Sequence, residues 1–296
     1  MLQKRRSQCK SRQCLKKRCA ARQRKALRLR CIVTYVRIRI ALSKMKSPTE
    51  SSTEYTRPLC CIVHLAETAL HEYQTNEKPW LVSCSGADPY VVKRPPLKRL
   101  IISDFVVGSL GNVLCAPVPQ IDLVYLTGEF LEMNPQCSDL GTGYAHGSRE
   151  VRDVHDSDAI EYIDGENRPR FALLSLLYGW MDPKDYQYLY GNDPPHLVWS
   201  HDHGWFLPGG NDWNSRTLAD ASPARVDYTV VNQVELSQKE INIARECLDA
   251  VTTEQVQDII NSIPKEWGIL DFERDTLFGF ITKRRIELLE SSKNVR

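Results

Sequence analysis

The chain has 296 residues, of which 39 are Lys or Arg and 37 are Asp or Glu, giving a formal net charge of +2. This length is enough to bury a substantial core, as a domain of two lobes requires. No apolar stretch approaches the about 20 residues that a membrane-spanning helix needs, and charges interrupt the apolar runs that a secretory signal would require.

Charge is distributed unevenly along the chain. Residues 1–46 contain 17 Lys and Arg and no acid, whereas residues 47–296 hold all 37 acids against 22 basic residues. The acidic body argues against a nucleic-acid-binding surface, so nucleic acid could bind only through the basic arm 1–46. The arm is a tail for nucleic acid or anionic membranes, a mitochondrial-type presequence, or a disordered or non-native leader before a start at Met45. The polar residues after Lys46 favour the third interpretation, in which the arm contacts the body little.

The first regular elements predicted in the body are two strands. Residues 80–82 and 90–92 are apolar and flank a turn with the sequence SCSGADP, which predicts a β-hairpin. Lys93 follows the second strand directly. A lysine at this position could reach phosphate oxygens in a cleft under the hairpin, or it could simply end an edge strand.

A helix is predicted next, over residues 99–114. Apolar residues recur at the spacing of an amphipathic helix, and Asp104 is its only acid. This aspartate is either an exposed helical residue or the partner of Lys93. Prolines 117 and 119 end the helix, and residues 121–126 predict a further strand.

Two carboxylates follow in the middle of the chain. An apolar run stops at Asp182, and a strand-like segment ends just before Asp202, which is followed two residues later by Gly204. Phosphoryl transfer needs one carboxylate to orient or deprotonate the acceptor and another to hold Mg²⁺ against nucleotide phosphates. The alternative is that both aspartates are turn formers or helix caps.

The last third of the chain is predicted to be helical. Ser237 and Glu240 form a capping box that starts a helix reaching about Val251. A further helix is predicted from Thr252 or Thr253 to Ile260, and another over residues 275–289. Residues 139–170 are polar and irregular, with one strand or hinge at their start, and residues 211–223 are expected to form an activation-type loop.

Taken in order, these parts resemble the HipA-like kinase family of bacteria in its short, stand-alone form, over about residues 60–290. The resemblance is carried by the segments YVVK, APVPQIDLVYL, GTGYAHGSREV, LYGWMDPKDYQ, SHDHGWF, IPKEW and FITKRRIELL. It implies an α+β, bilobal, protein-kinase-like fold. Residues 47–150 would form a β-rich N-lobe and residues 151–296 a helical C-lobe.

The resemblance also implies roles for individual residues. Lys93 matches the lysine that binds nucleotide phosphates, and Asp104 matches the helix acid that pairs with it. Asp182 matches the catalytic aspartate and Asp202 a metal-binding aspartate, with Gly204 allowing a tight turn. Gln187 stands where the family has an asparagine that binds metal. The adenine-binding hinge is expected to include Ser148, Glu150 and Val151.

Three departures from the family pattern leave room for an inactive relative. The helix acid is normally Glu rather than Asp104, the metal-binding amide is longer by one methylene at Gln187, and Pro183 replaces an arginine. The sequence therefore predicts an ATP- and Mg²⁺-dependent kinase acting on a protein or other hydroxyl acceptor. The alternative is a pseudokinase that serves as an interaction module.

Cysteines and histidines add little to this assignment. No CxxC pair occurs among the ten cysteines, and those of the body lie among apolar neighbours, so buried reduced thiols and a cytoplasmic location are expected. His196, His201 and His203 lie close together in the sequence. They could form a metal site, but the favoured interpretation is that they lie on a strand and a loop without a shared function.

Overall fold

A computed structural model describes residues 62–75, 77–93 and 99–295, which belong to one unit of the chain, Arg57–Arg296. The predictions for the basic arm 1–46 and for Cys60 and Cys61 lie outside the described residues. Among the described residues, no helix is long and apolar enough to cross a membrane.

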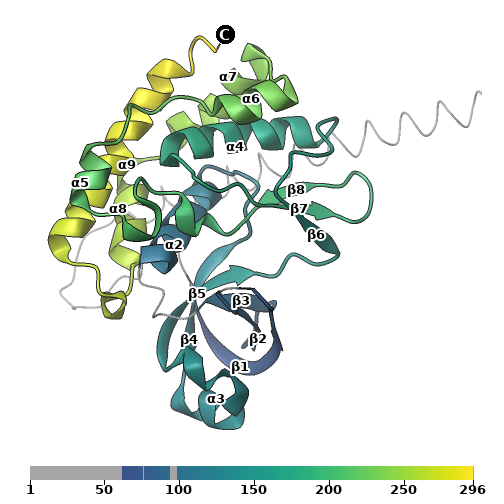
Figure 1. The fold of residues 1–296 in the computed structure, drawn as a ribbon, viewed down its shortest axis with the longest axis vertical. Helices are drawn as coiled ribbons and strands as arrows, with labels where there is room; N and C mark the ends of the chain where they lie inside the picture. Colours follow the sequence, from purple (N-terminus) through teal and green to yellow (C-terminus); the bar gives the residue numbers. More distant parts are fainter. Residues whose placement is uncertain (1–61, 76, 94–98, 296) are drawn as a thin grey trace, which may run out of the picture. The chain divides into compact units, whose positions relative to one another are not determined.

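The first part of the body is a closed β-barrel (Figure 1). Its strands follow one another around the barrel in the order β1-β2-β3-β5-β4, and β1 closes it by pairing in parallel with β4. The predicted hairpin is confirmed, because Trp80 of β2 faces Val92 of β3 in an antiparallel pair. The strands are β1 (Val63–Glu72), β2 (Trp80–Cys84), β3 (Tyr90–Lys93), β4 (Ile121–Leu126) and β5 (Gly143–Arg149).

Helix α2 (Arg99–Val113) links β3 to β4 and is buried on every side from Ile101 to Gly111. The prediction of an amphipathic helix was therefore wrong, although the helix itself is present. The reason is that α2 packs against the barrel strands β4 and β5 and also against helices of the second part, namely α4 (Asn167–Met181), α8 (Thr253–Ser262) and the 3₁₀ helix His203–Trp205. An element enclosed in this way has no polar face to show in its sequence.

The second part consists mostly of helices, with one small sheet. Strands β6 (Val154–Ser157), β7 (Tyr188–Gly191) and β8 (Val198–Ser200) form an antiparallel sheet in that order. In the described residues, helix α3 (Gly128–Met133) lies between β4 and β5 of the barrel, and the second part contains α4 (Asn167–Met181), α5 (Ser215–Ala219), α6 (Tyr228–Val234), α7 (Gln238–Ala250), α8 (Thr253–Ser262) and α9 (Asp271–Ser291). This arrangement confirms the predicted α+β class, with a β-rich first part and a helical second part.

Capping chemistry explains where the C-terminal helices begin. The predicted capping box of Ser237 and Glu240 is present, and a second one at Thr252 starts α8. Helix α9 begins four residues earlier than residue 275, because the Glu273 carboxylate accepts a hydrogen bond from Leu270 N at 2.9 Å. The polar segment 139–170 is less irregular than predicted, since it contains β5 and the half-exposed strand β6.

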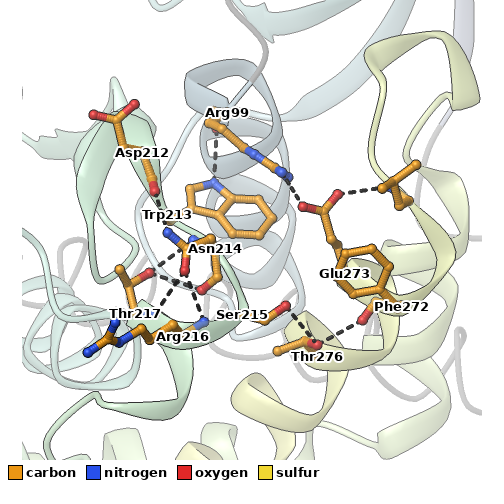
Figure 2. Close-up of polar contacts among 11 residues, drawn as sticks. Arg99, Asp212, Trp213, Asn214, Ser215, Arg216, Thr217, Phe272, Glu273 and Thr276 are labelled. Carbon is orange, nitrogen blue, oxygen red and sulfur yellow. Dashed lines mark hydrogen bonds and ion pairs between the residues drawn. The ribbon is translucent and has the colours of Figure 1, made fainter.

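The expected activation-type loop is in fact folded against other elements (Figure 2). Residues 211–223 include α5, which Asn214 caps by accepting hydrogen bonds from Arg216 N and Thr217 N. Trp213 precedes this cap and is 1% exposed. A buried tryptophan followed by a capped helical turn fixes the backbone here, so the segment is not an open loop.

Candidate functional site

Lys93, at the end of β3, forms the centre of the site. It pairs with His146 of β5 in the barrel register and is 8% exposed. Its Nζ atom lies 2.7 Å from Asp104, 2.5 Å from Asp202 and 2.9 Å from Glu77. Burial alone would lower the pKa of Lys93, but these three carboxylates outweigh it and raise the pKa. The lysine is therefore held as a cation.

Asp104, on α2, connects the lysine to the segment that carries Asp202. One carboxylate oxygen contacts Lys93, and the other accepts a hydrogen bond from His203 N at 2.9 Å. The imidazole of His146 also lies close, with Nε2 3.4 Å from the carboxylate. Burial opposes ionisation, but Lys93 and His146 hold the pKa of Asp104 well below its usual range. The shorter acid thus reaches both the lysine and the backbone next to Asp202.

The segment around Asp202 has an unusual backbone conformation. Asp202 follows β8 and adopts a left-handed conformation with φ of 53°, which aspartate tolerates better than most residues. The glycine at 204 does not have a positive φ, so the expected role of Gly204 in the tight turn was wrong. A Cβ atom at Gly204 would lie 3.2 Å from Leu100 Cδ2, so this glycine instead allows α2 to approach closely.

A chain of buried hydrogen bonds fixes this segment from the other side. His203 Nε2 lies 2.9 Å from Ser200 Oγ, which accepts a hydrogen bond of 2.8 Å from the hydroxyl of Tyr178 on α4. His203 and Ser200 are almost completely buried, and burial lowers the pKa of His203. Helix α4 and helix α2 therefore hold the residues on both sides of Asp202.

Most of the sequence-predicted site residues line one cavity of about 720 Å³. Lys93, Asp104 and Asp202 lie on its polar side, and apolar walls come from residues such as Val91, Ile121 and Leu189. A polar end and apolar walls suit a ligand with a charged group and a flat apolar part. The cavity is also lined by the predicted metal ligand Gln187 and the predicted hinge residues Ser148, Glu150 and Val151.

The side-chain amide of Gln187 forms one hydrogen bond within the protein. Its Nε2 atom donates a hydrogen bond of 2.8 Å to Asp185, a residue of the same loop. The carbonyl oxygen is the half of the amide that a cation would use. The contact with Asp185 does not use this oxygen, and the role of Gln187 as a metal ligand stays a prediction.

Asp182 lies at the C-cap of α4, in a left-handed conformation with φ of 70°. Its carboxylate is 43% exposed and accepts a hydrogen bond of 3.1 Å from Lys184. It lines a second cavity, of about 490 Å³, together with Tyr186, Arg225 and Asp227. Asp182 thus does not line the cavity of Lys93, and its catalytic role stays a prediction. The loop after it is joined to the Asp202 segment, because Lys184 N donates to Trp205 O.

The histidines of this region have separate environments. His196 stacks on Tyr162, whereas His201 pairs with Asp156 at 3.2 Å and His203 contacts Asp104 and Ser200. Within residues 62–75, 77–93 and 99–295, no three His, Cys, Asp or Glu side chains gather as a metal site. Cys84, Cys137 and Cys247 are free thiols, whereas Cys115 is exposed, so the expectation that the cysteines of the body are buried was wrong for Cys115.

Sequence reasoning missed Glu77, the third carboxylate on Lys93. Glu77 lies in the connection between β1 and β2, a polar stretch with no motif around it. It also missed His146, which is 1% exposed and has its imidazole Nε2 3.4 Å from the Asp104 carboxylate. Its neighbours Ala145 and Gly147 in β5 are buried as well, so no alternation along the strand could have marked His146 as buried.

Comparison with known proteins supports the kinase assignment for part of the chain. Residues 67–192 match the model of the HipA-like kinase family, a range that contains Lys93, Asp104, Asp182 and Gln187 but ends before Asp202. The predicted resemblance is therefore confirmed for this part of the chain, which is similar to the HipA-like kinase family. No curated protein that was compared matches the chain.

Two solved structures resemble this chain in backbone fold. The proinflammatory kinase CtkA of Helicobacter pylori shares 10% identity, with a TM-score of 0.49, and the match covers 75% of this chain and 91% of that one. The HipA, HipB and operator DNA complex of the Shewanella oneidensis MR-1 toxin–antitoxin system gives 10% identity and a TM-score of 0.39. This second match covers 88% of this chain and 72% of the other.

Proposed function

We propose that this protein is a kinase that transfers a phosphoryl group from ATP, with Mg²⁺, to a hydroxyl group of a protein or another acceptor. Residues 47–150 would act as its N-lobe and residues 151–296 as its C-lobe. One observation carries the proposal: Asp104 and Asp202 both contact the buried Lys93, at the polar end of a cavity large enough for a nucleotide.

Each residue of the cavity has a role in this proposal. Lys93 binds nucleotide phosphates, and Asp104 fixes the lysine in the orientation that allows this. Ser148, Glu150 and Val151 form the hinge at which the edge of adenine meets the backbone. Asp182 accepts the proton of the acceptor hydroxyl from the side of the second cavity, which leaves that cavity as the place for the acceptor.

The residues present fit a magnesium ion. Lys93 supplies one positive charge against three carboxylates, so the cluster retains an excess of negative charge. Mg²⁺ prefers oxygen ligands and is commonly held by one or two carboxylates together with nucleotide phosphates. Asp202 and the carbonyl oxygen of Gln187 would hold it. When bound, the ion would neutralise charge on the phosphates and favour their transfer.

A pseudokinase is the second candidate, and one contact favours it. Glu77 lies 2.9 Å from Lys93 and forms an ion pair with it. This ion pair competes with nucleotide phosphates for the lysine. If that contact persisted in solution, the domain would bind nucleotide weakly and would act through its surface. The two candidates differ in whether phosphate is transferred.

Transfer of labelled phosphate from ATP separates the candidates. The purified protein should label itself or an added protein in the presence of Mg²⁺. Asp202→Asn should lower labelling by about 100-fold or more while the protein stays folded. Wild-type labelling by that variant would end the assignment of Asp202. Binding of ATP with no transfer by the wild type would instead establish the pseudokinase.

The proposal also includes a location and a possible further partner for the protein. We expect it in the cytoplasm, because Cys84, Cys137 and Cys247 are free thiols and a reducing compartment preserves such thiols. Nucleic acid remains a candidate partner only for the basic arm 1–46, through its positive charge.

A further inference from the structure

The N-terminus of α2 is tied to two segments that are distant in the sequence (Figure 2). Arg99, the first residue of α2, forms an ion pair with Glu273 near the start of α9. Its guanidinium group also lies over the ring of Trp213, 4.4 Å from the centroid. The indole N–H of Trp213 donates a hydrogen bond of 3.3 Å to the carbonyl oxygen of Arg99. We refer to Arg99, Trp213 and Glu273 as the α2 clamp.

Both partners of Arg99 are themselves held in place. Glu273 is 6% exposed, and its second carboxylate oxygen caps α9 through Leu270 N. Burial opposes ionisation of Glu273, but the hydrogen bond from Arg99 leads the interactions that lower its pKa. The segment that carries Trp213 is joined to α9 by a contact of 3.3 Å between the hydroxyls of Ser215 and Thr276. The clamp is therefore anchored on rigid elements.

Helix α2 transmits this anchoring to the site. Asp104 lies five residues after Arg99 on the same buried helix, and its carboxylate contacts both Lys93 and the backbone of His203. A packed helix moves as a unit, so a change in the position of its first turn displaces Asp104. Displacements of about 1 Å in such a site can cost about 100-fold in rate.

Stability alone does not account well for the arrangement. Replacing a buried ion pair by apolar residues is often neutral for stability, so such a pair is weak evidence of a stabilising role. Moreover, Nη1 of Arg99 is buried and has no hydrogen-bond partner among the described residues. These two observations indicate that the guanidinium group of Arg99 serves to fix the position of α2 rather than to stabilise the fold.

We infer that Arg99 is a positioning residue. Through Trp213 and Glu273 it fixes α2, and thereby holds Asp104, Lys93 and Asp202 in the geometry that binds nucleotide phosphates. This inference rests on the proposed kinase function. In this inference, the segment around α5 fixes the position of α2 through the side chain of Trp213.

Three variants test the clamp against a matched control. Arg99→Gln removes the ion pair and the charge over Trp213, Arg99→Lys keeps the charge, and Trp213→Phe keeps an aromatic ring but loses the N–H donor. Arg168→Gln is the control, because Arg168 forms a comparable ion pair with Glu240 at 2.6 Å between α4 and α7. All are compared well below their unfolding temperatures.

Amide hydrogen exchange tests the clamp independently of catalysis. Exchange of residues 100–106 should become about tenfold faster in Arg99→Gln, because the first turns of α2 lose their anchor. Arg99→Lys should recover part of the protection, Trp213→Phe should lose part of it, and Arg168→Gln should leave these amides unchanged. Unchanged exchange in Arg99→Gln would overturn the clamp, whatever happens to activity.

A double-mutant cycle tests whether Arg99 acts through Asp104. Labelling per folded molecule should fall about tenfold in Arg99→Gln, but by less than about twofold when the same change is made in Asp104→Ala. Equal losses in both backgrounds would overturn the positioning role. If the wild type neither binds Mg²⁺–ATP nor transfers phosphate, the proposed function fails, and the exchange experiment still decides whether the clamp exists.

Discussion

At the scale of single residues, the proposed role of Gln187 as a metal ligand can be tested by substitution. Its amide nitrogen donates to Asp185, which leaves the carbonyl oxygen for a cation. We predict that Gln187→Asn keeps or raises the rate of phosphate transfer, whereas Gln187→Ala lowers it. Transfer of labelled phosphate at saturating Mg²⁺ measures both. Rates equal to wild type in both variants would show that Gln187 is not a ligand.

Glu77 is a second residue whose charge should matter. Its carboxylate lies 2.9 Å from Lys93, so nucleotide phosphates must compete with it for the lysine. Glu77→Gln should therefore tighten binding of Mg²⁺–ATP by about fivefold or more, as expected when one like charge is removed from the site. Glu72→Gln is the control, since Glu72 ends β1 and its carboxylate accepts a hydrogen bond of 3.1 Å from the side chain of Gln74. Weaker binding by Glu77→Gln, measured by calorimetry, would show that Glu77 assists binding instead.

At the scale of elements, the Arg168–Glu240 pair joins α4 to α7 and gives a pH-dependent contribution to stability. The hydrogen bond from Arg168 is the largest cause that lowers the pKa of Glu240 to about 2, from an ordinary value of 4.5. A lowered pKa in the folded state means that the contribution is complete above the ordinary value and is lost as pH falls towards 2.

Wild type should therefore exceed Glu240→Gln in stability at pH 7. The difference should shrink between pH 4.5 and pH 2, as Glu240 becomes protonated. Urea unfolding of both proteins across this range measures it. A difference that stays constant with pH would contradict the assigned role of Arg168. The glutamine variant also alters the capping box of α7, but that contribution adds to the same trend because it uses the same carboxylate.

Helix α4 also depends on a close approach of another segment. A Cβ atom at Gly179 would lie 2.1 Å from the carbonyl oxygen of Arg225, a backbone atom that cannot move aside easily. Gly179→Ala should lower the free energy of unfolding by about 1–3 kcal/mol or more. Gly279 of α9 is the matched control, because no atom lies within 4 Å of an added Cβ. Gly279→Ala should stabilise by about 0.5–1 kcal/mol. Equal effects in thermal unfolding would contradict the packing described.

The elements also show why part of the site could be predicted from the sequence. Lys93 is the last residue of the short strand β3, Asp202 comes two residues after β8, and Asp104 is the one acid of an apolar helix, so the local pattern singled them out. Glu77 and the Arg99–Glu273 pair have no local signal, because their partners are brought together only by the tertiary fold, across 174 positions in the case of Arg99 and Glu273. Gly204 was recognised but given the wrong role, since a glycine required for close packing looks the same in sequence as one required for a turn.

At the scale of the whole molecule, the barrel and the helical part meet at one cluster of charges. The barrel supplies Lys93 and His146, helix α2 supplies Asp104, and the segment after β8 supplies Asp202. Because the contacts cross between parts that are far apart in sequence, the cluster forms only when the whole body is folded. A ligand that binds this cluster should therefore stabilise the body as a unit.

Thermal unfolding with and without Mg²⁺–ATP tests the central claim most directly. At about 100-fold excess of nucleotide over its dissociation constant, we predict that the unfolding temperature of wild type rises by about 5 °C or more. Lys93→Met should abolish this rise, whereas Lys293→Met, which removes a lysine paired with Glu290 outside the cavity, should keep it. A wild type that gains no stability from Mg²⁺–ATP, or a Lys93→Met variant that gains as much as wild type, would contradict the assignment of this cavity as a nucleotide site.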